Sequence, residues 1–292
     1  MSSSVQPGKG VLRNAYSVDR PAQPAERTTQ HATHLPAIAP WLLRSFSAYS
    51  RWYVSRQFHS LRLSHSSPIP DVGELPLVIY ANHAAWWDPL ICLILQAGLF
   101  GNRRAYAPFD ARALQQYRFF ARLGFFGVEQ NHRRGAVQFL RTAEAVLCQP
   151  DSVLWLTPQG RFADTRERPV KFKPGLGHLP QRVERAAFVP LAVEYTHWEE
   201  RKPEVLCRFG PVEIAGVRCG FRAIEETDWS QHFQEQLQAT QDALAEESQR
   251  RNPADFEFIL RSGSGVGFFY DTWRALRAAA TGQTYHREHG KL

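Results

Sequence analysis

A histidine and an aspartate lie five positions apart in the segment N-H-A-A-W-W-D, which occupies residues 82–88. The segment follows the apolar run Leu77–Tyr80, which is typical of a buried strand. Asp88 precedes Pro89, a pair that predicts a helix start with Asp88 as its N-cap. If the loop folds back, the Asp88 carboxylate can hold one imidazole nitrogen of His83 while the other takes a proton from a substrate hydroxyl.

The pair also has simpler interpretations. His83 could be a hydrogen-bonded loop histidine and Asp88 a helix cap alone. Together they could ligate a metal, although the sequence suggests no third ligand at metal-site spacing. The position at the carboxyl end of a strand favours a ligand site, because open α/β sheets bind ligands there.

A basic turn follows a second predicted strand, Val153–Leu156. Pro158 and Gly160 favour a turn, and five Lys and Arg residues follow between Arg161 and Lys173. Free backbone amides beside cations suit a phosphate group. The alternative is a solvated basic loop.

Together these segments resemble the glycerolipid acyltransferases, the class that includes lysophosphatidate and glycerol-3-phosphate acyltransferases. The segment N-H-A-A-W-W-D matches that family's N-H-x-x-x-x-D block. Further similar blocks follow in the family's order: G-F-F-G-V-E-Q at 124–130, T-P-Q-G-R-F at 157–162, F-K-P-G at 172–175 and F-V-P-L-A-V at 188–193.

The resemblance implies a general base at His83, oriented by Asp88, and an acyl donor that is a thioester of coenzyme A or acyl carrier protein. It implies neither a metal nor a bound cofactor. The substrate-binding positions that it implies are Asn82, Gln130, Gln159, Gly160, Arg161, Lys173 and Pro190. Gln130 stands where the family has Arg and Gln159 where it has Glu, so the acceptor's polar head is expected to differ from glycerol phosphate.

The order of apolar runs and amphipathic segments predicts an α/β fold with a mixed central sheet flanked by helices. Amphipathic helices are expected at the N-terminus and a helical extension at the C-terminus. The predicted organisation is a mobile arm at 1–40, membrane-surface helices at 41–64, the acyltransferase domain at 65–220 and the C-terminal extension at 221–292. The extension includes predicted helices at 229–250 and 253–261 and an aromatic helix at 267–280.

The basic excess is concentrated near the N-terminus. Eight of the first 65 residues are Lys or Arg and only two are acidic. Between Trp41 and Leu63, arginines alternate with aromatic residues and no acidic residue occurs, a composition typical of a helix in a bilayer interface. The alternative is a helix packed on its own core. No apolar run reaches 18 residues, so we expect a peripheral protein at the cytoplasmic face of an anionic phospholipid membrane, without a nucleic-acid partner.

Three functional hypotheses remain from the sequence. The first is an O-acyltransferase that acylates a hydroxyl of a lysophospholipid or a related lipid, including a lipid without phosphate. The second is a peripheral lipid-binding protein that has the fold but no activity, as Gln130 and Gln159 would permit. The third, nucleic-acid binding, would rest on the basic N-terminal region alone.

Overall fold

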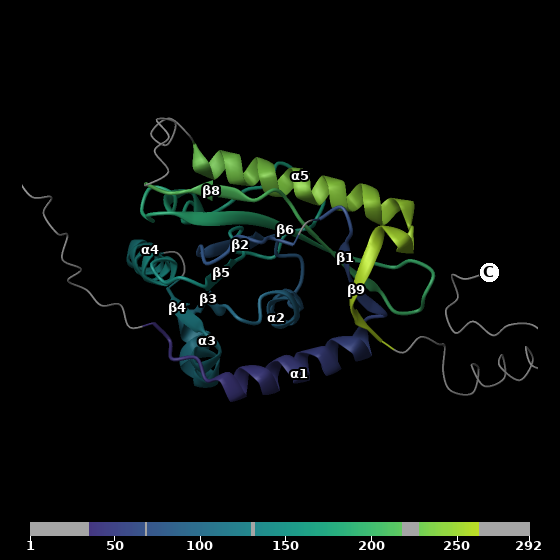
Figure 1. Ribbon diagram of the computed structural model, residues 1–292, viewed down its shortest axis with the longest axis horizontal. Coiled ribbons are helices and arrows are strands. Elements are labelled where there is room, and N and C mark those ends of the chain that lie inside the picture. The colour runs from purple at the N-terminus through teal and green to yellow at the C-terminus, as the bar shows by residue number, and fades with distance from the viewer. Residues whose placement is uncertain (1–34, 68, 130–131, 218–227, 263–292) are drawn as a thin grey trace, which may run out of the picture. The chain divides into compact units, whose positions relative to one another are not determined.

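The computed structural model describes residues 35–67, 69–129, 132–217 and 228–262 (Figure 1). The described residues all belong to the second of two units of the chain, Thr33–Leu292. The predicted mobile arm lies outside them up to residue 34, as do Gln130 and the predicted helix at 267–280. Among the described helices, none has the length and apolar character that crossing a bilayer requires.

The described residues form one sheet of nine strands with helices on both faces. The strands are β1 (Ser60–Ser64), β2 (Leu77–Ala81), β3 (Arg104–Asp110), β4 (Phe125–Val128), β5 (Ser152–Leu156), β6 (Ala186–Thr196), β7 (Glu204–Phe209), β8 (Glu213–Ala215) and β9 (Phe256–Arg261). The helices are α1 (Pro40–Gln57), α2 (Asp88–Leu99), α3 (Ala111–Gln116), α4 (Arg133–Leu147) and α5 (Trp229–Arg250). Short 3-10 helices are η1 (Arg118–Leu123), η2 (Leu176–His178) and η4 (Pro253–Asp255).

The strand order is β4-β3-β5-β2-β6-β7-β1-β9, with β8 paired to β6. The neighbours from β4 to β6 are parallel, whereas β7 and β8 pair with β6 in the antiparallel direction. The sheet is therefore mixed and the predicted α/β class is confirmed. Because β2 lies between two parallel neighbours, the residues that follow it emerge beside the carboxyl ends of β5 and β6.

Strand β2 is buried on both faces, as is usual for a strand in a parallel region. Leu77 and Ile79 belong to the hydrophobic cluster that includes residues of α1 and α2. Val78 and Tyr80 belong to the cluster that includes residues of α4 and α5. Figure 1 shows α1 and α2 on one side of the sheet and α5 on the other. Packing from both sides fixes the end of β2, from which the candidate site begins.

Three secondary-structure predictions were wrong. The helical pattern expected up to residue 63 ends at Gln57, and Ser60–Ser64 form β1 between β7 and β9. The helix expected over 253–261 is the turn η4 followed by strand β9. The sequence pattern of residues 111–123 also predicts a single helix, and this segment is divided at Tyr117 into α3 and η1. In the first two segments, pairing with distant strands outweighs local propensity.

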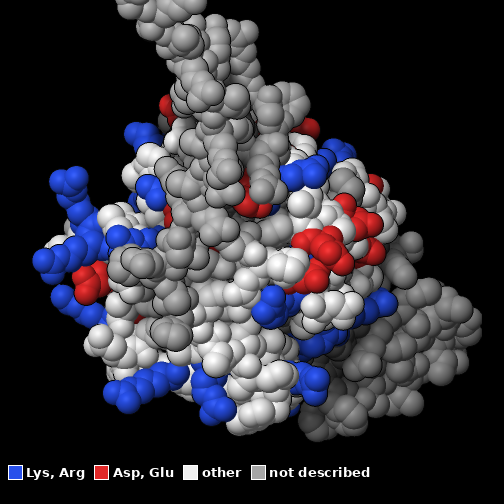
Figure 2. Space-filling view, turned by 60° about the vertical axis from the view of Figure 1, so that its left-hand side comes forward, with Lys and Arg blue, Asp and Glu red and all other residues white. Residues whose placement is uncertain are grey.

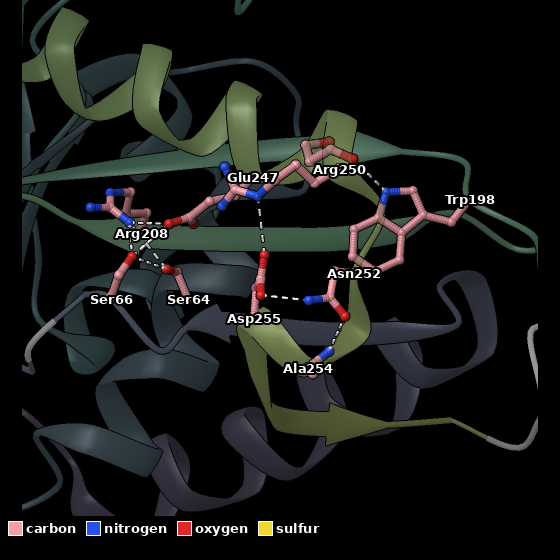
Figure 3. Close-up of polar contacts among 10 residues, drawn as sticks. Ser64, Ser66, Trp198, Arg208, Glu247, Arg250, Asn252, Ala254 and Asp255 are labelled. Carbon is pink, nitrogen blue, oxygen red and sulfur yellow. Dashed lines mark hydrogen bonds and ion pairs between the residues drawn. The ribbon is translucent and has the colours of Figure 1, made fainter.

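A polar network joins the C-terminal half of α5 to β1 and β7 (Figure 3). The Glu247 carboxylate accepts from the Arg208 guanidinium and from the Ser66 hydroxyl. Arg208 Nη1 also donates to Ser64 Oγ at 3.1 Å. The Glu247 side chain is 8% exposed and that of Arg208 is 19% exposed. The network therefore holds α5 in a fixed place against the sheet.

Replacing Glu247 with alanine is expected to lower the free energy of unfolding by about 2–3 kcal/mol, because Arg208 then keeps a partly buried charge without its partner. Urea unfolding followed by circular dichroism measures the change. Glu246→Ala is the matched control, since Glu246 is exposed on the same helix. A Glu247 variant as stable as the control would show that the network does not hold α5.

Candidate active site

The loop after β2 is attached to the neighbouring strand β6. Asn82 lies one residue beyond β2, where its side-chain amide Nδ2 donates to the Val193 carbonyl at 2.9 Å. Its Oδ1 accepts from the Val193 amide at 2.8 Å. The Asn82 side chain thus satisfies a backbone donor and acceptor of β6 as another strand would. Buried in this position, it fixes the start of the His83 loop.

His83 and Asp88 are in direct contact, as the spacing predicted. His83 Nδ1 lies 2.7 Å from Asp88 Oδ2. The same carboxylate oxygen accepts from the Ala85 amide at 3.0 Å. Because a carboxylate can only accept, Nδ1 carries the proton and Nε2 has a free lone pair. This is the tautomer that a general base requires.

The contact of Asp88 with His83 is the predicted one, but the predicted N-cap role of Asp88 is wrong. The N-cap residue of α2 is Trp87 and Asp88 is the first helical residue. The Asp88 carboxylate faces back to Ala85 and His83. Asp88 therefore closes the loop, and its side chain is only 1% exposed.

Tyr195, near the end of β6, is a third partner of Asp88 that the sequence motifs did not indicate. Its hydroxyl donates to Asp88 Oδ1. Burial, and after it the charge of Asp88, raises the pKa of Tyr195 far above its usual value. The hydroxyl therefore remains a donor, and with Tyr195 in place both oxygens of the buried carboxylate are hydrogen-bonded.

The His83 imidazole is partly exposed. The His83 side chain is 20% exposed. In the described part of the chain, no residue hydrogen-bonds to its Nε2. The Phe162 ring lies 4.4 Å from the imidazole, centroid to centroid, and Phe162 is 58% exposed. Nε2 is therefore accessible to a ligand, beside an apolar ring.

The turn after β5 packs directly on the His83 loop. Gln159 is buried, and its Oε1 accepts from the His83 amide at 2.8 Å. The Ala163 amide donates to the His83 carbonyl at 2.8 Å. The glutamine thus supplies an acceptor oxygen, which a glutamate would also supply. Its presence in place of glutamate leaves the loop closed.

Gly160 allows the turn to close beneath a lysine. Its φ of +62° lies in the left-handed region, and a Cβ there would come within 2.6 Å of Lys173 Cε. The Gly160 amide donates to the Thr157 carbonyl at 3.0 Å. Arg161 pairs with Glu167 and is exposed. Lys173 is thus the cation that lies directly over the turn.

The other predicted site positions lie elsewhere. Pro190 is buried within β6 opposite Tyr80, next to Gly210, three residues before Val193. A cavity lies beside the His83 loop, and Pro190 is not among the residues that line it. Gln130 lies outside the described residues. The structure therefore brings together Asn82, His83, Asp88, Gln159, Gly160 and Lys173.

A cavity of about 660 Å³ lies beside the loop. It is lined by Ala84, Ala85 and Trp87 of the loop, by residues 163–166 and Arg168, by the end of β6 and by α5. Its apolar wall includes Phe58, Val193 and Leu244, while Arg166 and Arg168 pair with Asp164 and Asp242. Its volume is within the usual range for a small-molecule site. Within the described residues, no three His, Cys, Asp or Glu side chains are grouped to hold a metal ion.

Comparison with known proteins agrees with this geometry. A family model described as acyltransferase matches residues 60–194, which include β1 to β5, most of β6, the His83 loop and the turn after β5. Among curated proteins, no match was found. The resemblance noted from the sequence blocks is confirmed by the family match. Residues 60–194 therefore form a domain of the acyltransferase family.

Proposed function

We propose that the protein is an O-acyltransferase that moves a fatty acyl group from a thioester to a hydroxyl of a lysophospholipid or a related lipid. The observation that carries the proposal is the His83–Asp88 pair, with Nδ1 held and Nε2 accessible. The neighbouring cavity, which Ala84 and Ala85 of the same loop line, offers an aliphatic chain an apolar wall. The acyltransferase family match supports acyl transfer as the chemistry.

The proposed reaction uses His83 first as a base and then as an acid. Nε2 removes the proton of the acceptor hydroxyl while the hydroxyl oxygen attacks the thioester carbonyl carbon. The tetrahedral intermediate then collapses, the carbon–sulfur bond breaks and the imidazolium returns the proton to the leaving thiolate. The products are an ester and a free thiol, and no covalent bond to the protein forms. Asp88 stabilises the imidazolium and Tyr195 keeps Asp88 oriented.

Lys173 is our candidate for stabilising the negative oxygen of the intermediate. The Gly160 amide, an alternative donor, already donates to Thr157. Arg161 is neutralised by Glu167. The ammonium group of Lys173 lies over the turn that holds the His83 loop. A cation placed there is suited to charge that develops on the carbonyl oxygen.

Contact with a membrane surface is part of the proposal. Helix α1 exposes Trp41, Tyr49 and Trp52 at 60%, 47% and 52%. Trp86 of the active-site loop is 55% exposed and its ring lies 6.4 Å from that of Tyr53 on α1. Exposed aromatics with arginines between them suit a bilayer interface. The aromatic surface would place the His83 loop next to its lipid substrate.

Replacing Trp52 and Trp86 together with serine is expected to reduce co-sedimentation with anionic phospholipid vesicles several-fold, because two exposed rings no longer enter the interface. Val212→Ser, which changes an exposed apolar residue between β7 and β8, is the control. Point variants are preferable to removing residues 1–64, because that deletion takes β1 out of the sheet. If both variants co-sediment equally with the vesicles, the proposed contact between this aromatic surface and the membrane is refuted.

Mass spectrometry of reaction products tests the proposed function. The purified protein is incubated with acyl-coenzyme A or acyl carrier protein thioesters and a panel of lipids, each with a free hydroxyl. We expect a mass increase of one acyl group on at least one lipid. If no lipid gains an acyl group with any donor, the inactive lipid-binding alternative replaces the proposal.

A further inference from the structure

A second cavity, of about 740 Å³, lies at the edge of the sheet farthest from β9. It lies along β4 and α4, with apolar contributions from Leu114, Phe125, Phe126 and Val137. Three arginines, Arg133, Arg134 and Arg141, line it together with Gln138 and Thr142. No step of the proposed reaction uses these residues.

The cavity has an unbalanced positive charge. None of the residues that line it is acidic. Within the described residues, Arg133, Arg134 and Arg141 take part in no ion pair. Figure 2, which brings forward the side of Figure 1 where α4 and β4 lie, shows basic side chains around an uncharged area in its lower part, with acidic side chains among or next to basic ones at the left and right. Three guanidinium groups without an ion-pair partner in the described part of the chain, beside aromatic rings, favour an anion that carries a flat apolar group.

The distance from His83 decides which part of the substrates can reach this cavity. Arg133 begins α4 just beyond the carboxyl end of β4, at the same edge of the parallel strands as His83. The order β4-β3-β5-β2 separates them by three strand spacings, or about 14 Å. The phosphate of a lysophosphatidate lies only a few bonds from its reacting hydroxyl. An acceptor phosphate in this cavity would therefore hold the hydroxyl far from His83.

The thioester donor has the required length. In coenzyme A, the pantetheine arm between the sulfur and the diphosphate has the length of about four peptide units, roughly 15 Å when extended. Its far end is an adenine nucleotide with an additional 3′-phosphate, that is, an anion with a flat apolar group. Acyl carrier protein has the same arm but binds by its surface and needs no cavity for a nucleotide.

We infer that the cavity lined by Arg133, Arg134 and Arg141 binds the adenosine 3′,5′-bisphosphate end of acyl-coenzyme A. The inference rests on the proposed acyl transfer and specifies its donor. The guanidinium groups hold the phosphates, and the phenylalanines of β4 provide the apolar contact for adenine. The pantetheine arm then passes over the ends of β3 and β5 and brings the thioester to His83.

Isothermal titration of the full chain with coenzyme A and with adenosine 3′,5′-bisphosphate tests the inference without catalysis. The variant is Arg134→Gln/Arg141→Gln, which removes two cations from one face of α4. The matched control is Arg185→Gln, because Arg185 is exposed and lies outside the cavity. We expect the double variant to weaken both ligands at least about tenfold and the control to leave both unchanged. Dephospho-coenzyme A should bind the unaltered protein more weakly than coenzyme A.

The possible outcomes separate this inference from the proposed function. Coenzyme A binding that is equal in the double variant and the control would overturn the cavity assignment, whether or not acyl transfer occurs. Turnover with acyl carrier protein thioesters but not with coenzyme A thioesters would overturn it and leave the proposed function in place. Arginine-dependent coenzyme A binding without any acyl transfer would support the cavity and refute the function.

Discussion

Replacing His83 with alanine is expected to reduce the rate of acyl transfer by about 10²- to 10⁴-fold, the usual contribution of a positioned general base. The imidazole is the only part of the candidate site with a lone pair that is both oriented by Asp88 and accessible to substrate among the described residues. Without it, the acceptor hydroxyl must react while it still carries its proton. The rate of thiol release from the acyl thioester measures the loss.

Two controls make the His83 result specific. His178→Ala removes an exposed histidine outside the site and should leave the rate unchanged. Circular dichroism should show the same fold for both variants, because the loop is also held by Asn82 and Gln159. A His83 variant that keeps more than half of the original rate would exclude His83 as the base.

Replacing Asp88 with asparagine is expected to lower kcat by about 10³- to 10⁴-fold, since an amide group in that position can donate to Nδ1 and favour the wrong tautomer. The effect acts through the imidazole, so we expect KM for both substrates to change little. Steady-state kinetics with each substrate varied separate the two parameters.

Tyr195→Phe tests the same carboxylate with a milder change than Asp88→Asn. It removes one of the donors to the carboxylate but leaves the contact with His83, so a loss of about tenfold is expected. Equal rates for Asp88→Asn and the unaltered protein would show that Asp88 has a structural role alone.

The local part of the site could be predicted from the sequence. The run Leu77–Tyr80 indicates a strand, and Asp88 with Pro89 indicates a helix start five residues after His83. A short loop between the two elements forces the imidazole and the carboxylate to approach each other. The family blocks added the turn at Gln159 and Gly160, which packs against this loop in the structure.

The parts that were missed depend on contacts between distant residues. Tyr195 reaches Asp88 only because β6 pairs with β2, and no local pattern marks its hydroxyl. A tyrosine two residues beyond the strand segment V-P-L-A-V was the available signal. Strands β1 and β9 pair with each other, and the amphipathic patterns of both resemble helices when each is taken alone.

The two cavities could not be derived from the sequence for the same reason. The cavity beside the His83 loop is lined on one side by α5, which lies more than 100 residues after His83 in the chain and which the network of Arg208 and Glu247 holds on the sheet. The cavity on β4 unites residues of α4 and β4 with Leu114 of α3 and with residues that precede and follow α3. Motif spacing places single side chains, whereas a cavity is defined by the packing of whole elements.

A single-turnover reaction tests the central claim most directly. The protein is mixed in excess with a labelled acyl thioester and its acceptor lipid, and thiol, ester and intact protein mass are followed together. We predict that thiol and ester appear at one rate, that the protein gains no mass, and that both products are lost in His83→Ala. An acylated protein, or an unchanged rate in that variant, would contradict base catalysis by His83.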